Sequence, residues 1–145
     1  MRALLLAALL AGPGPAPAKG EASRATDCRA ASAVRCDPAG CAPVEEGLDA
    51  ERFSVDLRAR TVTACLYTDC LSGKATVVRD PARPWVATAF ALVRSGRRPG
   101  STPPPGSGPL AVTVTVDLRT GRFSASWGLS PEGQQTDFGA CTLER

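Results

Sequence analysis

Six cysteines and no histidine are the features that most constrain what this chain can fold into. Outside the cytosol paired cysteines usually form disulfides, because those compartments are oxidising. The lack of histidine removes the most common general base and the most common metal ligand of proteins. The composition therefore predicts a small, disulfide-stapled domain, with no cofactor and no metal.

The N-terminus has the features of a secretory signal peptide. Arg2 precedes an apolar run at residues 3–11, and the small residues Ala16 and Ala18 form a cleavage site. A membrane span needs about 20 apolar residues, roughly twice the length of this run. We therefore expect residues 1–18 to be removed, with no membrane insertion afterwards and a periplasmic or extracellular location.

The rest of the chain is predicted to hold one domain at residues 28–145, after a flexible leader at residues 19–27. The net charge of the whole chain is only +3, which gives no reason to expect nucleic acid as a partner. Arginine greatly outnumbers lysine, and the chain has no asparagine and no isoleucine. This usage is typical of a GC-rich bacterial genome.

Alternation of apolar and polar residues predicts an all-β fold. The pattern is clearest at residues 110–118, where every second residue is apolar, as in a half-buried antiparallel strand. We expect an antiparallel sandwich or small barrel of about six to eight strands. The strands are predicted at residues 53–57, 61–66, 75–79, 85–93, 110–118, 123–127 and 136–143.

Two segments lack such a pattern. Residues 28–50 show neither helical nor strand periodicity, so we expect an irregular, stapled N-terminal segment with a short helical turn near its end. Residues 94–109 are rich in proline and glycine and are predicted to form a long polar loop. Arg94, Arg97 and Arg98 make the loop basic, so it is either a contact for an acidic partner or a solvated connection, and the composition favours a connection.

A short sequence echo links two parts of the chain. Val-Asp-Leu-Arg occurs at residues 55–58 and again at residues 116–119, and the alternation that follows is matched. The echo is explained by two similar hairpins, either through duplication or because the sequence suits the step from strand to turn. Both stretches are predicted to form hairpins.

The cysteine spacing favours one disulfide pairing among 15 possible ones. Cys36 and Cys41 have the same spacing as Cys65 and Cys70, so each pair is expected to close a local loop. Cys28 and Cys141 would then join the two ends of the domain. Zinc binding by the four closely spaced cysteines is the alternative, and secretion argues against it.

No recognised catalytic motif is present, so the chain is predicted not to be an enzyme. Without histidine there is no serine or cysteine triad, and no nucleophile elbow or phosphate-binding loop occurs. Paired carboxylates are the remaining option, and the candidates are Asp56, Asp69, Asp117, Glu132 and Asp137. Trp127 and Phe138 are expected in the core.

These observations predict a secreted or periplasmic non-catalytic β domain that binds a protein or another ligand. The expected partner is another secreted or periplasmic protein. One alternative is an inhibitor of a secreted hydrolase, such as a lysozyme or a protease. It would act through a loop at residues 94–109 or 128–137. A second alternative is a hydrolase that uses carboxylates alone.

Overall fold

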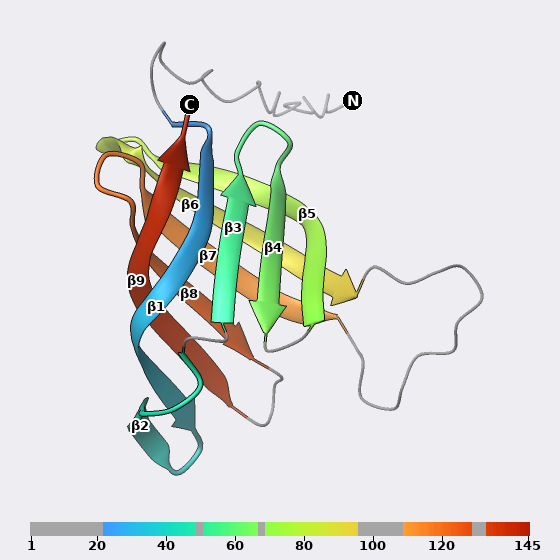
Figure 1. Cartoon of the computed structure of the whole chain (residues 1–145), viewed down its shortest axis with the longest axis vertical. Coiled ribbons are helices and arrows are strands. Elements are labelled where there is room, and N and C mark those ends of the chain that lie inside the picture. Colours follow the sequence, from blue (N-terminus) through green and yellow to red (C-terminus); the bar gives the residue numbers. More distant parts are fainter. Residues whose placement is uncertain (1–21, 49–50, 67–68, 96–108, 129–132) are drawn as a thin grey trace, which may run out of the picture.

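The chain folds into a closed antiparallel β-barrel with one additional strand, as the computed structural model in Figure 1 shows. The structure describes residues 22–48, 51–66, 69–95, 109–128 and 133–145. Its strands are β1 (Arg24–Asp37), β2 (Gly40–Val44), β3 (Glu51–Asp56), β4 (Thr61–Leu66), β5 (Asp69–Asp80), β6 (Arg83–Ser95), β7 (Leu110–Asp117), β8 (Arg122–Gly128) and β9 (Gln134–Glu144).

The barrel is closed because β1 pairs with both β3 and β9. From β3 to β9 each strand is antiparallel to the next, so eight strands form the ring. The ninth, β2, pairs with the C-terminal part of β1 and extends the sheet beyond one end of the barrel. The expected all-β fold is therefore confirmed, and of the two architectures considered it is a barrel.

Small apolar side chains fill the interior. Ala87, Ala89 and Ala91 on β6 are buried, and an eight-stranded barrel is just wide enough for its own side chains to fill it. Phe53 and Phe123 are the largest buried apolar residues, and their ring centroids lie 6.1 Å apart. The alternation read from the sequence thus places these side chains inside.

The prediction of an irregular N-terminal segment was wrong. Residues 24–37 form the long strand β1, which begins within the predicted leader, and residues 40–44 form β2. Two register shifts, at residues 25–28 and 30–32, break the alternation of β1, and Asp27 has a φ of 45°. Bulges of this kind remove the period of two by which strands are recognised.

Both copies of the Val-Asp-Leu-Arg sequence form hairpins with the same register. Val55 pairs with Val62, and Val116 pairs with Phe123, seven residues along in each case. Residue 57 donates its backbone N–H to Ser23, and the equivalent residue 118 donates to Trp85. Each hairpin therefore contacts the strand before it in the same way.

The structure contains three disulfides, in the pairing that the spacing favoured. Cys36–Cys41 and Cys65–Cys70 each staple one hairpin, whereas Cys28–Cys141 joins β1 to β9 where the barrel closes. Every cysteine is paired. Three intramolecular disulfides indicate an oxidising environment.

Candidate functional site

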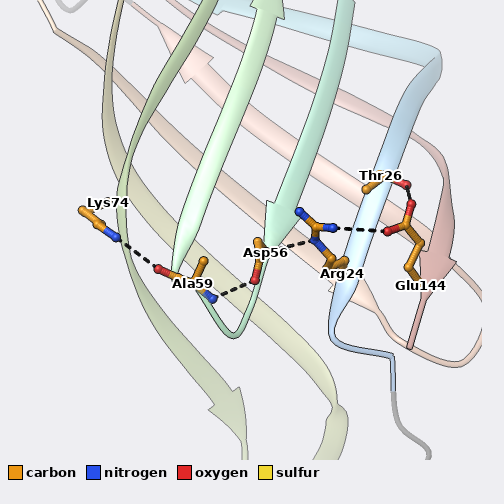
Figure 2. A network of polar contacts seen from close by, with 6 residues as sticks. All are labelled: Arg24, Thr26, Asp56, Ala59, Lys74 and Glu144. Carbon is orange, nitrogen blue, oxygen red and sulfur yellow. Dashed lines mark hydrogen bonds and ion pairs between the residues drawn. The ribbon is translucent and has the colours of Figure 1, made fainter. Parts of the chain in front are cut away.

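Asp56, the first of the candidate carboxylates, has a structural role in the turn between β3 and β4. Its Oδ1 accepts the backbone N–H of Ala59 at 2.7 Å, and its Oδ2 lies 2.9 Å from Nε of Arg24 (Figure 2). Arg24 also lies 3.7 Å from Glu144, so the contacts connect β3, β1 and β9 at one rim. The backbone N–H of Ala59 is the main cause that lowers the pKa of Asp56.

Asp117 plays the same part in the second hairpin. Its Oδ1 accepts the backbone N–H groups of Arg119 and Thr120, at 2.8 and 3.2 Å. These bonds, led by the one from Arg119, lower the pKa of Asp117. Among the described residues, Asp56 and Asp117 contact turn N–H groups and arginines, and neither contacts a second carboxylate. The side chain of Asp69 and the whole of Glu132 lie outside the described residues.

Asp137 is different, because it forms a buried acidic pair with Glu51. Glu51 begins β3 with only 2% of its surface exposed, and Asp137 in β9 is completely buried. The two carboxyl groups lie close enough for each to affect the proton affinity of the other. Asp137 was among the carboxylates predicted from the sequence, whereas Glu51 was not.

Gln135 connects the acidic pair to a cation. Its Nε2 donates to Oε2 of Glu51 at 2.9 Å and to Oδ1 of Asp137 at 2.7 Å. Its Oε1 accepts from Nη2 of Arg35 at 2.8 Å. Nε1 of Trp127 donates to the other oxygen of Asp137 at 2.7 Å. The five side chains form a chain of hydrogen bonds that begins on β1 and ends on β8.

Burial disfavours the simultaneous ionisation of both carboxyl groups. Desolvation, followed by the charge of Asp137, raises the pKa of Glu51 from 4.5 to about 7. Desolvation also raises the pKa of Asp137, while the donors Gln135 and Trp127 oppose that rise. Both carboxyl groups are therefore harder to ionise than exposed ones, and Glu51 keeps its proton up to about pH 7.

A groove of about 460 Å³ lies on the outside of the barrel beside this network. One wall is the turn of the β1–β2 hairpin at residues 36–38, and the other is the outer face of β7 and β8 with Thr113 and Ser126. We call it the hairpin groove. Trp127 also borders the groove, but it alternates with the outward Ser126, and its indole donates to the buried Asp137 on the inner side of the sheet.

An apolar ridge borders the groove. Val78 on β5 and Phe90 and Leu92 on β6 point outward, with exposed fractions of 52%, 47% and 59%. Phe90 pairs with Thr113, a residue of the groove wall, and Leu92 pairs with Ala111, which also lines the groove. Because Val78 pairs with Thr88, it lies diagonally opposite Phe90 on the same face. The ridge and the groove thus form one continuous surface.

Phe138 was predicted in the core, and this was wrong. It lies on the outer face of β9 with 44% of its surface exposed, one residue away from the buried Asp137. Because neighbours in a strand face opposite sides, burial of the carboxylate at 137 requires exposure of the phenyl ring at 138. Trp127 packs partly buried against the core, as expected.

The three arginines of the predicted loop are only partly described. Arg94 belongs to β6, where it pairs with Ser72, and β6 ends at Ser95. The side chain of Arg94 and all of Arg97 and Arg98 lie outside the described residues, as does the predicted signal peptide. Their proposed contact with an acidic partner stays a prediction.

Neither a metal site nor a membrane-spanning helix is found in the part of the chain that the structure describes. No group of three or more potential ligands among Cys, Asp and Glu lies together there. Within the same residues no helix is long and apolar enough to cross a membrane. A scan against protein-family models found no match, and neither did searches of curated proteins and of solved structures.

Proposed function

We propose that this protein is a non-catalytic binding domain, secreted to the periplasm or the medium, that binds another protein through the hairpin groove and the apolar ridge. The observation that carries the proposal is the position of Val78, Phe90 and Leu92, three large apolar side chains exposed together on neighbouring strands. Clusters of this kind on a soluble protein commonly mark an interaction site.

The chemistry of the surface indicates what kind of segment binds. The ridge offers two aliphatic side chains and one phenyl ring, and the groove adds the hydroxyls of Thr113 and Ser126. Asp37 is the only charged side chain among the described groove residues. A short extended segment with apolar side chains fits such a surface, with its backbone close to the hydroxyl groups.

The state of the carboxylates supports binding over hydrolysis. Glu51 and Asp137 are both buried and hydrogen-bonded within the protein, whereas a carboxylate that attacks or protonates a substrate must reach it. The carboxyl groups of Asp56 and Asp117 accept backbone N–H groups within their own turns. The described part of the chain thus gives more support to a binding surface than to a carboxylate hydrolase.

The proposal is tested by selecting peptides from a displayed random library on the immobilised, oxidised protein. We expect the wild type to enrich peptides with apolar side chains, and the F90D/L92D variant to bind them at least about ten-fold more weakly. The control is S32D, which places a negative charge on an exposed position of β1, a strand that pairs with neither β5 nor β6.

Two results would contradict the proposal. One is equal binding of the selected peptides by F90D/L92D and S32D, and the other is enrichment of no peptide at all. The inhibitor alternative is tested separately by adding the protein in stoichiometric amounts to a panel of lysozymes and proteases. Loss of activity in one member of the panel would identify the partner as an enzyme.

A further inference from the structure

A second groove, of about 660 Å³, continues the surface of the hairpin groove along β7 and β8. Thr113 and Ser126 lie in the hairpin groove. Thr115 and Ser124, the next outward residues of the same two strands, lie in the second groove. Arg122 also lines the second groove, which we call the Arg122 groove. The two grooves therefore form one trough along this pair of strands.

Apolar side chains border the trough on both sides. On the β6 side are Phe90 and Leu92 of the apolar ridge, which pair with residues of β7 in the hairpin groove. On the β9 side is Phe138, which lines the Arg122 groove and pairs with Ser124. An extended segment in the trough would therefore cover both phenyl rings and keep its backbone near the hydroxyl groups of β7 and β8.

The charges in the Arg122 groove leave one cation without a partner. The charged residues that line it are Arg83, Asp117 and Arg122. Nε of Arg83 lies 2.8 Å from Oδ2 of Asp80. Asp117 accepts N–H groups of its own turn and lies 3.9 Å from Nε of Arg119. Among the described residues, no carboxylate forms an ion pair with the exposed Arg122, so this arginine can pair with an acidic group of a partner.

The hairpin end of the trough carries the opposite charge. Asp37 lines the hairpin groove, and its Oδ1 accepts the backbone N–H groups of Ala39 and Gly40, at 2.8 and 3.1 Å. Within the described part of the chain, no cation forms an ion pair with it. Along β7 the trough extends from Ala111 to Asp117, about 20 Å at about 3.4 Å per residue. About six residues of an extended segment span this distance.

We propose that the trough binds an extended segment of the partner protein in one direction, with an acidic residue at Arg122, apolar residues between the phenyl rings and a basic residue at Asp37. Charge complementarity sets the direction, because the reversed segment would bring like charges together at both ends. The inference rests on the proposed function, since it specifies which segment binds to the same surface.

The test determines the sequences of the peptides selected on the wild type and measures the affinity of the tightest-binding one at low ionic strength. We expect an acidic and a basic residue about six positions apart, on either side of apolar residues. The variant R122E should bind this peptide at least about five-fold more weakly. R58E is the matched control, because it makes the same change of charge at an exposed arginine in the β3–β4 turn.

A change in the peptide shows whether the effect comes from charge. Replacing its acidic residue with lysine should weaken binding to the wild type and restore binding to R122E. R122Q removes the charge without reversing it, should have an intermediate affinity, and tests the same pairing if R122E does not fold. S32D adds a negative charge beyond Phe138, two strands away from Ser124, and should weaken binding less than R122E does.

Two results would overturn the inference while leaving the proposed function intact. One is a loss of affinity in F90D/L92D together with equal affinities of R122E and R58E. The other is a loss in R122E that the lysine-containing peptide does not reverse. If the selection enriches no peptide, the proposed function fails, and the inference fails with it.

Discussion

Arg60 and Gly121 occupy the same position in the two equivalent hairpins, and both have a left-handed backbone. Their φ angles are 52° and 74°, and the backbone oxygen of each accepts an N–H from the following strand, Ala75 in one case and Cys141 in the other. Glycine adopts this conformation without strain, whereas an arginine does so at a cost. One hairpin therefore has the residue that its turn requires, and the other does not.

Replacing Arg60 with glycine should stabilise the protein. The substitution relieves the unfavourable φ and should raise the free energy of unfolding by about 0.5–1 kcal/mol, measured by urea denaturation. R58G is the matched control, because Arg58 lies in the same turn without a positive φ, and it should bring no gain. A stabilisation by R58G as large as that by R60G would contradict the explanation.

The opposite substitution at the equivalent position should destabilise it. In G121A the new Cβ would lie 2.6 Å from the carbonyl oxygen of Cys141 and would also have to adopt the left-handed conformation. We expect the free energy of unfolding to fall by more than about 1 kcal/mol. An unchanged urea midpoint for G121A would show that the turn relaxes freely.

The stability of the protein should decrease as the pH rises from about 5 to 8. Glu51 releases its proton near pH 4.5 when unfolded but at about pH 7 when folded, so between these values the folded state binds more protons. The free energy of unfolding should fall by up to about 3 kcal/mol across this range. In E51Q this loss should be absent, and the variant should be more stable than the wild type at pH 8.

Below this range the pH dependence should have the opposite sign. The pKa values of Asp27, Asp56, Asp80 and Asp117 are lowered in the folded state, so the stability they provide is present above pH 4 and lost as the pH falls further. Thermal unfolding followed from pH 2 to pH 9 should therefore show a maximum near pH 5. A curve that still rises between pH 5 and pH 8 would contradict the buried acidic pair.

The disulfide between Cys28 and Cys141 should contribute more to stability than the other two. It closes a loop with a sequence separation of 113 residues, compared with 5 for Cys65–Cys70. The chain-entropy model gives about 4–5 kcal/mol for the long loop and about 2 kcal/mol for the short one. Urea midpoints of C28A/C141A and C65A/C70A should differ accordingly, and equal losses would show that the closure of the barrel is held by other contacts.

Neutralising the two turn aspartates should reduce stability without affecting binding. In D56N/D117N the charged acceptors of the turn N–H groups become neutral amides, and the ion pair of Asp56 with Arg24 is lost. We expect a loss of about 1 kcal/mol for each turn. The affinity for a selected peptide should stay at the wild-type value. A large loss of affinity in a folded double variant would indicate that these carboxylates take part in binding.

The mass of the secreted protein tests the predictions made from its N-terminus. A signal peptide ending at Ala18 should be missing from the intact mass after expression with export in a bacterial host. Reduction should add six hydrogen atoms, two for each disulfide. Free thiols in the exported protein, or retention of residues 1–18, would contradict secretion as described.

Much of the barrel could be predicted from the sequence because its strands alternate strictly. All seven predicted strands are confirmed, from the one that starts near Phe53 to the last one at residues 134–144. In β7 the pattern is unbroken, since Leu110, Val112, Val114 and Val116 all face inward. In β1 the buried residues Ala25, Cys28 and Ala33 are spaced unevenly, so no simple period reveals the strand.

The acidic pair was missed for a different reason. Glu51 lies two residues before Phe53 and therefore faces the same side of the strand as Phe53 and Val55. A predicted strand that began at residue 51 would have placed its side chain in the interior. Asp137 is likewise inward because it alternates with Phe138. The sequence does not show that β3 and β9 both pair with β1. This long-range pairing brings the carboxyl groups of Glu51 and Asp137 close to each other.

The pairing of β1 with β9, which closes the barrel, also determines where a fusion partner can be attached. The backbone N–H of Ser23 donates to the carbonyl oxygen of Glu144 at 2.8 Å, so the first and last strands start and finish side by side. This rim is opposite the end that carries β2. A fusion partner joined at either terminus would therefore leave the hairpin groove unobstructed. Linking residues 23 and 144 directly should allow a circular permutant to be opened elsewhere.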